Sequence, residues 1–446
     1  MAITTRRFKT YPAYRHSGVE WMGEVPAHWE VKRLKHLATL NPESLMEDTD
    51  PTREMVYVDI GGVDSLGRIV EREQLTFATA PSRARRLVRD GDVIVSTVRT
   101  YLRAIAPISD SESGTVVSTG FAVVRPAHDL ITDYAAYALR APYFVERVVA
   151  NSKGVSFPAI NESEMATYEL ASPPDLEQRA IAAFLDRETA RIDALVAKKE
   201  RLIALLQEQR TALISRAVTK GLDPAVPMKD SGVEWLGEIP AHWEVKRIKF
   251  IAQVGNGSTP NRDNPEYWGG EYPWLNSSVV NLHEVTEGSD FVTGLALAEC
   301  HLPRVLPPAV LVGITGEGRT RGMATVLRAE ATINQHLAFI RPTCGHADVE
   351  YLRYVFHSAY QFLRDESGGG GSTKGALTCE QLENMPIAFP LEAEQRAIAA
   401  LLDRETARID ALVGKVREAV ERLKELRTAL ISAAVTGKID VRQEVA

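Results

Sequence analysis

Cysteine is scarce in this 446-residue sequence, and the spacings that would make it useful are absent. The three cysteines, Cys300, Cys344 and Cys379, are an odd number, and none lies in a Cys-x-x-Cys pair. Neither a disulfide framework nor a zinc site follows from such a pattern. The sequence therefore predicts a protein of the reducing cytoplasm without a metal site.

Long hydrophobic runs and targeting segments are also missing. The first residues, MAITTRRFKTYP, contain no apolar stretch of the kind found in signal peptides. The longest aliphatic run, AVLVGI at 309–314, is far shorter than the ~18 residues that a membrane span needs. We therefore expect no membrane association. A phosphate-binding Gly-x4-Gly-Lys-[Ser/Thr] motif is absent as well.

An overall surplus of positive charge is missing too. The formal net charge is −7, which taken alone disfavours a nucleic-acid-binding protein, so the local distribution of charge decides. A hydrophobic content of 45% with 25% charged residues is ordinary for a soluble globular protein. The length predicts two to four domains.

What the sequence does contain is an internal repeat. SGVEWMGEVPAHWEVKRLK at 17–35 recurs as SGVEWLGEIPAHWEVKRIK at 231–249, with sixteen of nineteen positions identical. A second duplication pairs EQRAIAAFLDRETARIDALV at 177–196 with EQRAIAALLDRETARIDALV at 394–413, and RTALISRAVT at 210–219 recurs as RTALISAAVT at 427–436. The chain is thus two half-molecules, each with a constant lead-in, a variable body and a constant tail. The stretch 220–232 joins them.

The constant tails are predicted to be long helices, the first over 177–217 with Asp175 and Gln178 as a capping box. Apolar residues follow a coiled-coil spacing in both tails: Ile181, Leu185, Ile192, Leu195, Leu202, Leu206 and Leu213, and then Ile398, Leu402, Ile409, Leu412, Val416, Leu423, Leu426 and Leu430. Neither helix can bury this stripe alone. We therefore expect the two helices to pack antiparallel, with the bodies at opposite ends and related by a pseudo-two-fold axis.

The variable bodies share a pattern without sharing sequence. Each has a β-rich run, a strand that ends in Arg-Pro (118–126 and 334–342), a short aromatic helical segment, a Gly/Ser loop and a final strand. This order predicts an α+β fold for both. Two differing bodies held apart by a spacer suit recognition of two half-sites on one long ligand, and duplex DNA is such a ligand.

These features together resemble the specificity subunit of a type I restriction–modification system. The motif W-x-G-E-[VI]-P-x-H-W-E occurs twice, and so do the E-Q-R-A-I-A helix entry, preceded by Pro174 or Pro390, and the R-T-A-L-I-S-x-A-V-T tail. The resemblance covers essentially the whole chain. It implies an α+β protein with two target-recognition domains, 1–175 and 219–392, a central spacer helix at 176–218 and a C-terminal spacer helix and tail at 393–446.

The resemblance also implies a subunit without catalysis of its own. Each target-recognition domain would read one half of a bipartite sequence in double-stranded DNA, while the helices set the spacing and dock the methyltransferase subunits, two of them by expectation. A restriction subunit would join that core. S-adenosylmethionine, ATP and magnesium would belong to these partners, so no cofactor is expected in this chain.

Two clusters of arginine are the first candidates for DNA contact, because arginine binds phosphates and reads guanine. Residues 79–104 carry a net charge of +4 and residues 301–328 carry +3. The candidates in these clusters are Arg83, Arg85, Arg86, Arg99 and Arg103 in the first body and Arg319 and Arg321 in the second. The alternative for each is a solvated charged face.

Polar loops supply the second set of candidates. In NSKGVSFPAI (151–160) and ESGGGGSTKGALT (366–378), glycines let the backbone approach a phosphate, and Lys153, Ser156, Ser372, Thr373 and Lys374 can donate to it. The second body adds Asn256, Ser258, Thr259, Asn276 and Ser277, since asparagine pairs with adenine. A flexible surface loop or a polar turn is the alternative.

The repeated tryptophans, Trp21, Trp29, Trp235 and Trp243, have two interpretations. They form either a docking surface for identical partners or a structural clasp between each lead-in and its helix, and we favour the clasp. His28 and His242 are expected to be packed or hydrogen-bonded rather than to bind metal.

Two other functions are weighed against DNA recognition. A DNA adenine methyltransferase would need an Asn/Asp-Pro-Pro-aromatic motif, but NPEY at 264–267 lacks the second proline, and DIGGVD at 59–64 leads into no evident cofactor-binding unit. A coiled-coil tether without sequence-specific DNA binding is the stronger alternative. Such a tether has no need of arginine clusters.

Overall fold

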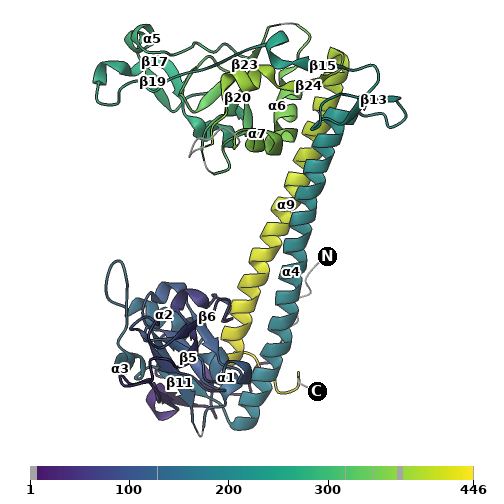
Figure 1. Cartoon of the computed structure of the whole chain (residues 1–446). Helices are drawn as coiled ribbons and strands as arrows, with labels where there is room; N and C mark the ends of the chain where they lie inside the picture. Colours follow the sequence, from purple (N-terminus) through teal and green to yellow (C-terminus); the bar gives the residue numbers. More distant parts are fainter. Residues whose placement is uncertain (1–7, 128, 317, 344, 369–374, 445–446) are drawn as a thin grey trace. The chain divides into compact units, whose positions relative to one another are not determined.

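The computed structural model describes residues 8–444 except 128, 317, 344 and 369–374 (Figure 1). The chain forms two compact units: unit 1 comprises Met1–Glu200 and Glu418–Ala446, and unit 2 comprises Arg201–Arg417. Both boundaries fall inside the long helices α4 (Asp175–Lys220) and α9 (Glu392–Val435). Each unit therefore contains one body, a segment of α4 and a segment of α9.

The body of unit 1 is a mixture of short strands and short helices. Its strands are β1 (Tyr14–His16), β2 (Glu24–Pro26), β3 (Glu30–Arg33), β4 (Ala38–Leu40), β5 (Glu54–Val58), β6 (Glu73–Thr76), β7 (Ala84–Leu87), β8 (Val93–Ser96), β9 (Ile105–Pro107), β10 (Val116–Ser118), β11 (Phe121–Pro126) and β12 (Glu169–Ser172). Its helices are α1 (Thr132–Ala138), α2 (Pro142–Ala150) and α3 (Glu162–Met165), with 3-10 helices η1 (Leu34–His36), η2 (Ile60–Gly62), η3 (Thr100–Leu102) and η4 (Asp110–Glu112).

The body of unit 2 has the same character. Its strands are β13 (Met228–Asp230), β14 (Glu238–Pro240), β15 (Glu244–Arg247), β16 (Ala252–Asn256), β17 (Trp268–Leu275), β18 (Glu284–Val285), β19 (Asp290–Val292), β20 (Ala309–Gly313), β21 (Ala324–Leu327), β22 (Thr332–Ile333), β23 (Leu337–Pro342) and β24 (Pro386–Phe389). Its helices are α5 (Gly294–Glu299), α6 (Val349–Ser358), α7 (Tyr360–Glu366) and α8 (Cys379–Asn384), with 3-10 helices η5 (Ile248–Phe250), η6 (Pro265–Tyr267) and η7 (Ser277–Asn281). The expected α+β fold is confirmed in both bodies.

The two bodies share one sheet topology despite their different sequences. The central sheet has the strand order β4-β11-β8-β9 in unit 1, and β16-β23-β20-β21 begins the corresponding sheet in unit 2. A parallel pair stands beside it in each unit, β5 with β10 and β17 with β22. The lead-in strand β3 pairs with β12, and β15 pairs with β24. The duplication therefore extends through the variable bodies. They keep the same fold through their composition and their alternation of apolar and polar residues, although their sequences are no longer alike.

The core lies between each central sheet and the helices that follow it. In unit 1, Val93 and Val95 of β8 and Ala122 of β11 are buried in one cluster with the aromatic residues of α1 and α2. In unit 2, Val310 and Val312 of β20 occupy the same place against α6. Alternate residues of each strand face this cluster, and the opposite face of the sheet buries a second, smaller cluster.

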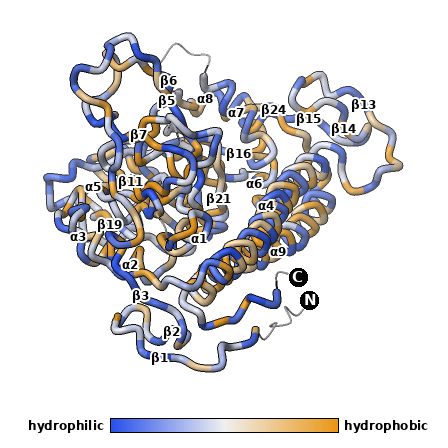
Figure 2. The backbone as a smooth tube through the Cα atoms, turned by 90° about the horizontal axis from the view of Figure 1, so that it is seen from below, coloured by the Kyte–Doolittle hydropathy of each residue, from blue (hydrophilic) through white to orange (hydrophobic). Residues whose placement is uncertain are grey.

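The long helices α4 and α9 pack side by side within each unit, as Figures 1 and 2 show. In unit 1, Ile192 of α4 shares a buried cluster with Leu423 and Leu430 of α9, and Arg427 donates to Asp193 (3.0 Å). Each unit combines one end of α4 with the opposite end of α9, so the helices run antiparallel as predicted. The helix predicted over 177–217 is confirmed and is slightly longer.

Part of the predicted seam is not buried. Leu195 and Leu202 of α4 are 40% and 43% exposed, and Leu412 and Leu426 of α9 are 42% exposed each. A helix with a single neighbour can cover only one side of its apolar stripe, so the flanking leucines stay half in solvent. The predicted capping box is also wrong, because α4 already includes Asp175 and the side chain of Gln178 is used elsewhere.

Gln178 instead anchors the loop before α1, and its repeat Gln395 anchors the loop before α6. The Gln178 amide donates to the carbonyls of Pro173 (2.9 Å) and Asp129 (2.8 Å) and accepts from the Ile131 N–H (2.8 Å). Gln395 makes the same three bonds in unit 2. Both side chains are fully buried. The repeated E-Q-R-A-I-A motif thus fixes each body to its helix.

The repeated lead-in forms the predicted clasp. The indole Nε1 of Trp29 donates to Glu177 Oε2 (2.9 Å), and His28 Nε2 lies 2.7 Å from Glu177 Oε1. In unit 2 the repeated pair Trp243 and His242 lies 2.9 and 3.1 Å from Glu394 Oε2. The two histidines are hydrogen-bonded, as expected. Trp21 is half exposed and Trp235 stacks on Phe362, so the clasp uses only the second tryptophan of each motif.

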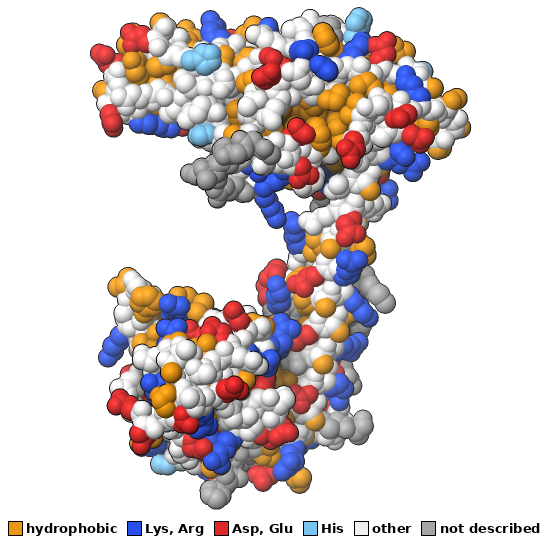
Figure 3. Space-filling model, in the orientation of Figure 1, with side chains coloured by type: hydrophobic (Ala, Val, Ile, Leu, Met, Phe, Trp, Pro, Cys, Tyr) orange, Lys and Arg blue, Asp and Glu red, His pale blue; other side chains and the backbone are white. Residues whose placement is uncertain are grey.

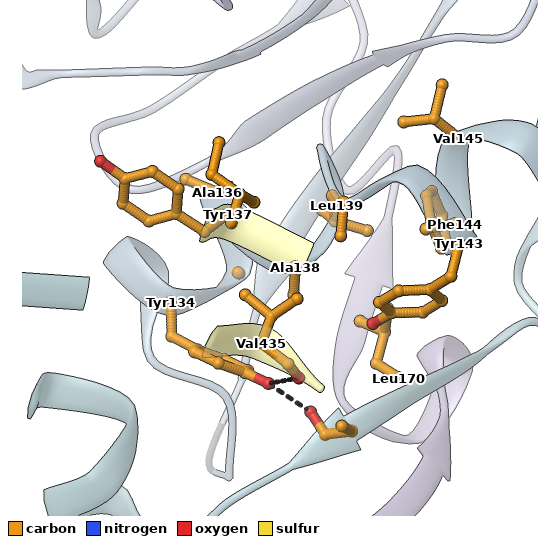
Figure 4. Close-up of a cluster of buried hydrophobic side chains, with 14 of the residues drawn as sticks. Tyr134, Ala136, Tyr137, Ala138, Leu139, Tyr143, Phe144, Val145, Leu170 and Val435 are labelled. Carbon is orange, nitrogen blue, oxygen red and sulfur yellow. Dashed lines mark hydrogen bonds between the residues drawn. The ribbon is translucent and has the colours of Figure 1, made fainter. Parts of the chain in front are cut away.

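Equivalent tyrosines join the bodies to the ends of the helices. The hydroxyl of Tyr134 donates to the carbonyls of Ala171 (2.9 Å) and Val435 (3.2 Å), the bonds drawn in Figure 4. Tyr351 repeats this arrangement with Ala388 (2.8 Å) and Val218 (3.2 Å). Both tyrosines are buried, and burial raises the pKa of each, so they act as neutral donors.

Among the described residues, no helix has the length and apolar character needed to cross a bilayer.

His357 on α6 should make unit 2 sensitive to acid. Its Nε2 lies 3.0 Å from the Ala324 carbonyl, and burial, reinforced by nearby Arg353 and Arg210, lowers its pKa to about 4. In the unfolded chain the His357 imidazole takes up a proton near pH 6.5, whereas in the folded chain it stays neutral until the pH approaches 4. The stability that neutral His357 contributes is therefore present above pH 6.5 and is lost as the pH falls towards 4. From His357 we expect a loss of about 3 kcal/mol in the free energy of unfolding between pH 7 and pH 4, measured with urea.

The variant His357→Gln is the matched control, because an amide can donate to the same carbonyl without titrating. Its unfolding free energy should vary less with pH than that of the wild type by the same amount. An identical pH dependence in both proteins would contradict the assignment to His357.

Candidate nucleic-acid interface

The β8–β9 hairpin of unit 1 ends in a tightly folded tip. Its 3-10 turn η3 is flanked by Arg99 and Arg103, which both have a left-handed backbone with φ of +53°. A non-glycine residue pays roughly 1–2 kcal/mol of strain in this region. Strained positions of this kind persist where the surrounding structure enforces them and concentrate at functional sites.

The loop 151–160 lies against this tip and helps to enforce it. The Arg99 N–H donates to the Pro158 carbonyl (2.8 Å), and the Ile160 N–H donates to Thr97 (2.9 Å). The hydroxyls of Thr100 and Ser152 are 2.8 Å apart, and Val98 forms a β-bridge with Ala159. We call residues 97–103 and 151–160 the first loop pair.

The first loop pair carries cations without acidic partners. Arg103 and Lys153 are exposed, and within the described residues neither makes a side-chain hydrogen bond or an ion pair. Arg99 is also exposed, and its guanidinium lies over the ring of Phe157 at 4.7 Å. Exposed cations with no carboxylate beside them are free to bind phosphate.

The other predicted arginines of the first body are engaged within it. Arg83 donates to Asp59 (2.7 Å) and to the Tyr57 hydroxyl (3.2 Å), and these two groups raise its pKa. Arg86 pairs with Glu162 (2.6 Å), and Arg85 lies over the ring of Phe77. The structure therefore separates the predicted cluster into structural arginines and the two at the hairpin tip.

Unit 2 repeats the loop pair at the β20–β21 hairpin. Thr315 forms a β-bridge with Ala376, and the Leu377 N–H donates to the Ile314 carbonyl (2.8 Å). This bridge is displaced by 217 residues from the Val98–Ala159 bridge on both strands, which is the offset of the repeated tails. We call residues 314–316, 318–322 and 375–378 the second loop pair. The predicted candidates Ser372, Thr373 and Lys374 lie outside the described residues.

Arg319 and Arg321 lie on the second loop pair. Arg319 is exposed, and within the described residues its side chain has no hydrogen bond or ion pair. Arg321 is half-buried, and its Nε is enclosed without a hydrogen-bond partner. Its guanidinium lies so close to Gly375 that a Cβ there would be 1.9 Å from Nη1. Glycine is therefore required at 375 for the arginine to hold this position.

A row of hydrogen-bonded polar side chains leads away from the second loop pair. Thr259 donates to Gln335 Oε1 (2.6 Å), the Gln335 amide contacts His336 Nε2 (3.3 Å), and His336 Nδ1 lies 2.6 Å from the Thr315 hydroxyl. Of these four residues, only Thr259 is predicted from the sequence. Glutamine can read adenine with two hydrogen bonds, so Gln335 joins the candidates.

The remaining polar candidates of unit 2 lie at the ends of β16 and β17. Asn256 and Ser258 are half-buried, and the Ser258 carbonyl accepts from the Trp274 indole (3.1 Å). Asn276 caps η7 by accepting from the Ser278 N–H (2.9 Å), and Ser277 lies inside that turn. Asn276 therefore has the polar-turn role given as its alternative. In unit 1, Ser156 is exposed at the tip of the first loop pair.

The two motifs considered for a methyltransferase have local structural roles. Asn264 of NPEY accepts from the Glu266 N–H (3.1 Å) and caps η6, so its side-chain oxygen is occupied. Asp59 of DIGGVD pairs with Arg83, and the segment continues into the short turn η2. In the described part of the chain, no group of three or more His, Cys, Asp or Glu side chains is arranged to hold a metal ion.

Comparison with known proteins gives one consistent family. The family model of the type I restriction modification DNA specificity domain matches twice, at residues 26–204 and 240–422. The MjaIX specificity subunit of Methanocaldococcus jannaschii is 34% identical over 172 residues, which are 37% of this chain and 38% of that protein. The HindI specificity subunit of Haemophilus influenzae is 22% identical over 86% of this chain and 94% of its own length.

Solved structures agree on the fold. A chain from a structure of the type I restriction–modification system superposes with a TM-score of 0.75 and 24% identity, over 93% of this chain and 99% of its own. The HsdS subunit from Thermoanaerobacter tengcongensis has a TM-score of 0.55 and 23% identity, over 93% and 98% of the two chains. Since the family model covers most of the sequence in two copies, the chain belongs to the DNA specificity subunits of type I restriction–modification systems.

Proposed function

We propose that each unit reads one half of a bipartite DNA target and that it does so through its loop pair. One observation carries this proposal. The two bodies differ in sequence, yet in each an exposed arginine lies at the tip of the same hairpin, beside the same second loop, and has no acidic partner among the residues that the structure describes. Two domains that recognise different half-sites require binding loops in equivalent positions that carry different side chains.

The candidate residues then have distinct roles. The cationic side chains that reach solvent contact phosphates or guanine edges. These side chains are Arg99, Arg103, Lys153, Arg319 and Arg321. Gln335 and Asn256 are the amide side chains placed to read adenine. The hydroxyl groups contact the DNA phosphates, and they belong to Ser156, Ser258, Thr259 and Ser277. Asn276 shapes the turn η7 instead. Ser372, Thr373 and Lys374 stay candidates from sequence alone.

Catalysis belongs to the partners in this proposal. Methyltransferase subunits, two of them, dock on the repeated surfaces of α4, α9 and the lead-ins, where half-exposed leucines such as Leu195 and Leu412 remain uncovered. S-adenosylmethionine is held by those subunits, and ATP and magnesium serve the restriction subunit. The assembly works in the cytoplasm, where its DNA lies.

Salt dependence tests the proposal on the complex of this chain with its methyltransferase subunits. The double variant Arg99→Gln, Arg103→Gln should weaken binding to a duplex that carries the target by roughly tenfold or more, since charged hydrogen bonds are lost. The slope of log affinity against log salt should fall by about one for each arginine. Fluorescence anisotropy over a salt series measures both quantities.

Arg83→Gln with Arg89→Gln is the matched control, because these arginines pair with Asp59 and Glu43. We expect a change in slope of less than one. Equal effects of the two double variants would refute the assignment to the loop pair. Binding of duplex DNA that does not respond to salt would instead favour the tether.

A further inference from the structure

The first loop pair exposes large apolar side chains as well as cations. Val155 is 101% exposed, Phe157 is 58% exposed, and Tyr101 and Leu102 are 54% and 38% exposed. In Figure 1 the loop that links α2 to α3 projects from the body of unit 1, and Figure 3 shows hydrophobic and basic side chains together at that edge of the unit. Clustered apolar residues on a soluble surface mark an interaction site.

The loop that carries these residues is held in place by its own hydrogen bonds. The N–H of Lys153 donates to the Ala159 carbonyl (2.8 Å), and the N–H of Ala159 donates back to the Lys153 carbonyl (2.9 Å). Gly154 has φ of +113° and approaches the Phe157 backbone, where a Cβ would lie 3.2 Å from the carbonyl oxygen. The base of the apolar tip is therefore closed by backbone hydrogen bonds before any partner binds, which lowers the entropic cost of ordering the loop.

The surrounding charge identifies the occupant. Within the described residues no carboxylate pairs with Arg99, Arg103 or Lys153, which frame the apolar tip. A protein partner would have to bring its own acidic side chains, whereas duplex DNA offers phosphates on both sides of a groove and apolar thymine methyl groups inside it. Cations around an apolar centre match that arrangement.

We infer that Val155 and Phe157 make direct apolar contact with bases of the half-site read by unit 1, and that thymine methyl groups are what they recognise. This inference rests on the proposed DNA-reading function. The corresponding stretch of unit 2, SGGGGSTKG at 367–375, contains no apolar side chain, so the contact belongs to one half-site only. The two bodies then share a framework and differ in the chemistry of the tip.

The test uses the complex of this chain with its methyltransferase subunits and the variants Val155→Ser and Phe157→Ser. Adenine methylation is mapped in cells by single-molecule sequencing for the wild type and each variant. We expect the variants to lose a thymine requirement in one half-site while the other half-site stays unchanged. The result for Val155→Ser is easier to interpret, because Phe157 also packs against the guanidinium of Arg99.

Binding to the mapped duplex with uracil in place of single thymines isolates the methyl group. Removing a recognised methyl should weaken wild-type binding roughly fourfold. The Val155→Ser complex should bind the thymine and uracil duplexes equally. Met46→Ser and Val70→Ser, at exposed apolar residues of unit 1 outside the loop pair, are matched controls that should retain the wild-type motif.

The outcomes separate the two proposals. If the wild type methylates a bipartite motif but the Val155→Ser and Phe157→Ser variants keep the same motif and the same response to uracil, the apolar contact is wrong and the DNA function stands. The apolar contact is also wrong if both half-sites change. If the wild-type complex produces no bipartite methylation, the DNA function fails and the apolar contact fails with it.

Discussion

Replacing Glu177 with alanine is expected to lower the free energy of unfolding by about 3–4 kcal/mol, because it leaves two buried donors, the Trp29 indole and the Tyr11 hydroxyl, without this hydrogen-bond acceptor. Glu177 is only 8% exposed, and its carboxylate accepts from Trp29 (2.9 Å) and Tyr11 (3.1 Å) and contacts His28 (2.7 Å). Burial and this carboxylate raise the pKa of Tyr11, so its hydroxyl stays protonated and needs an acceptor. Denaturant unfolding of the isolated chain measures the loss.

The second copy of the clasp supplies the matched comparison. Glu394 contacts Trp243 (2.9 Å) and His242 (3.1 Å), and its side chain is 29% exposed, against 10% for Glu177. Water can replace more of the hydrogen bonds that Glu394→Ala removes, so we expect the free energy of unfolding to fall by about 1–2 kcal/mol. Equal losses for the two variants, or none for Glu177→Ala, would show that the clasp does not depend on the buried carboxylate.

Inserting seven residues into both long helices is expected to change the spacing of the DNA target. The repeat offset of 217 residues places Lys198 of α4 and Lys415 of α9 at matching positions, close to the unit boundaries. One heptad inserted after each keeps the apolar register and adds about 10 Å along the helices. At roughly 3.4 Å per base pair, the gap between half-sites should grow by about 3 bp, with both half-sites unchanged.

A heptad inserted into α4 alone is the control for this prediction. It leaves seven residues of one helix without a counterpart in the other, so we expect a protein that unfolds more easily and methylates no defined motif. If the doubly lengthened protein folds and retains the original gap, the helices do not set the spacing.

The repeat made the architecture predictable, because two copies of one sequence reveal which segments carry structure. The helices, their antiparallel packing and the clasp by Trp29 and Trp243 all follow from residues that occur twice. The extent of burial did not follow, since Leu195 and Leu412 fit the heptad pattern as well as their buried neighbours do. A helix pair covers one side of each stripe, and the sequence does not state which side.

The candidate interface was only partly predictable, because it is assembled from distant segments. The carboxylates that engage Arg83 and Arg86 are Asp59 and Glu162, which lie 24 and 76 residues away. Charge counting therefore could not separate these arginines from Arg99 and Arg103. Gln335 was not predicted because no other candidate stands beside it in the sequence, and it joins the site through its side-chain contacts with Thr259 and His336.

The apolar tip was not predictable for a different reason. Val155 and Phe157 occur in a loop whose glycine, serine and lysine predict phosphate contact, and apolar residues in such a loop are ordinarily expected to turn inwards. Their exposure is a property of the folded loop, in which the Lys153–Ala159 pairing directs the intervening side chains to solvent.

Genome-wide mapping of methylated adenines tests most directly the claim that the two units read two half-sites. The chain is co-expressed with its methyltransferase subunit in cells that lack other adenine methylation, and the sites are read by single-molecule sequencing. Two short specific sequences separated by a gap of fixed length and no base preference are the predicted result. A continuous motif, or no methylation by a partner shown to be active with another specificity subunit, would contradict the claim.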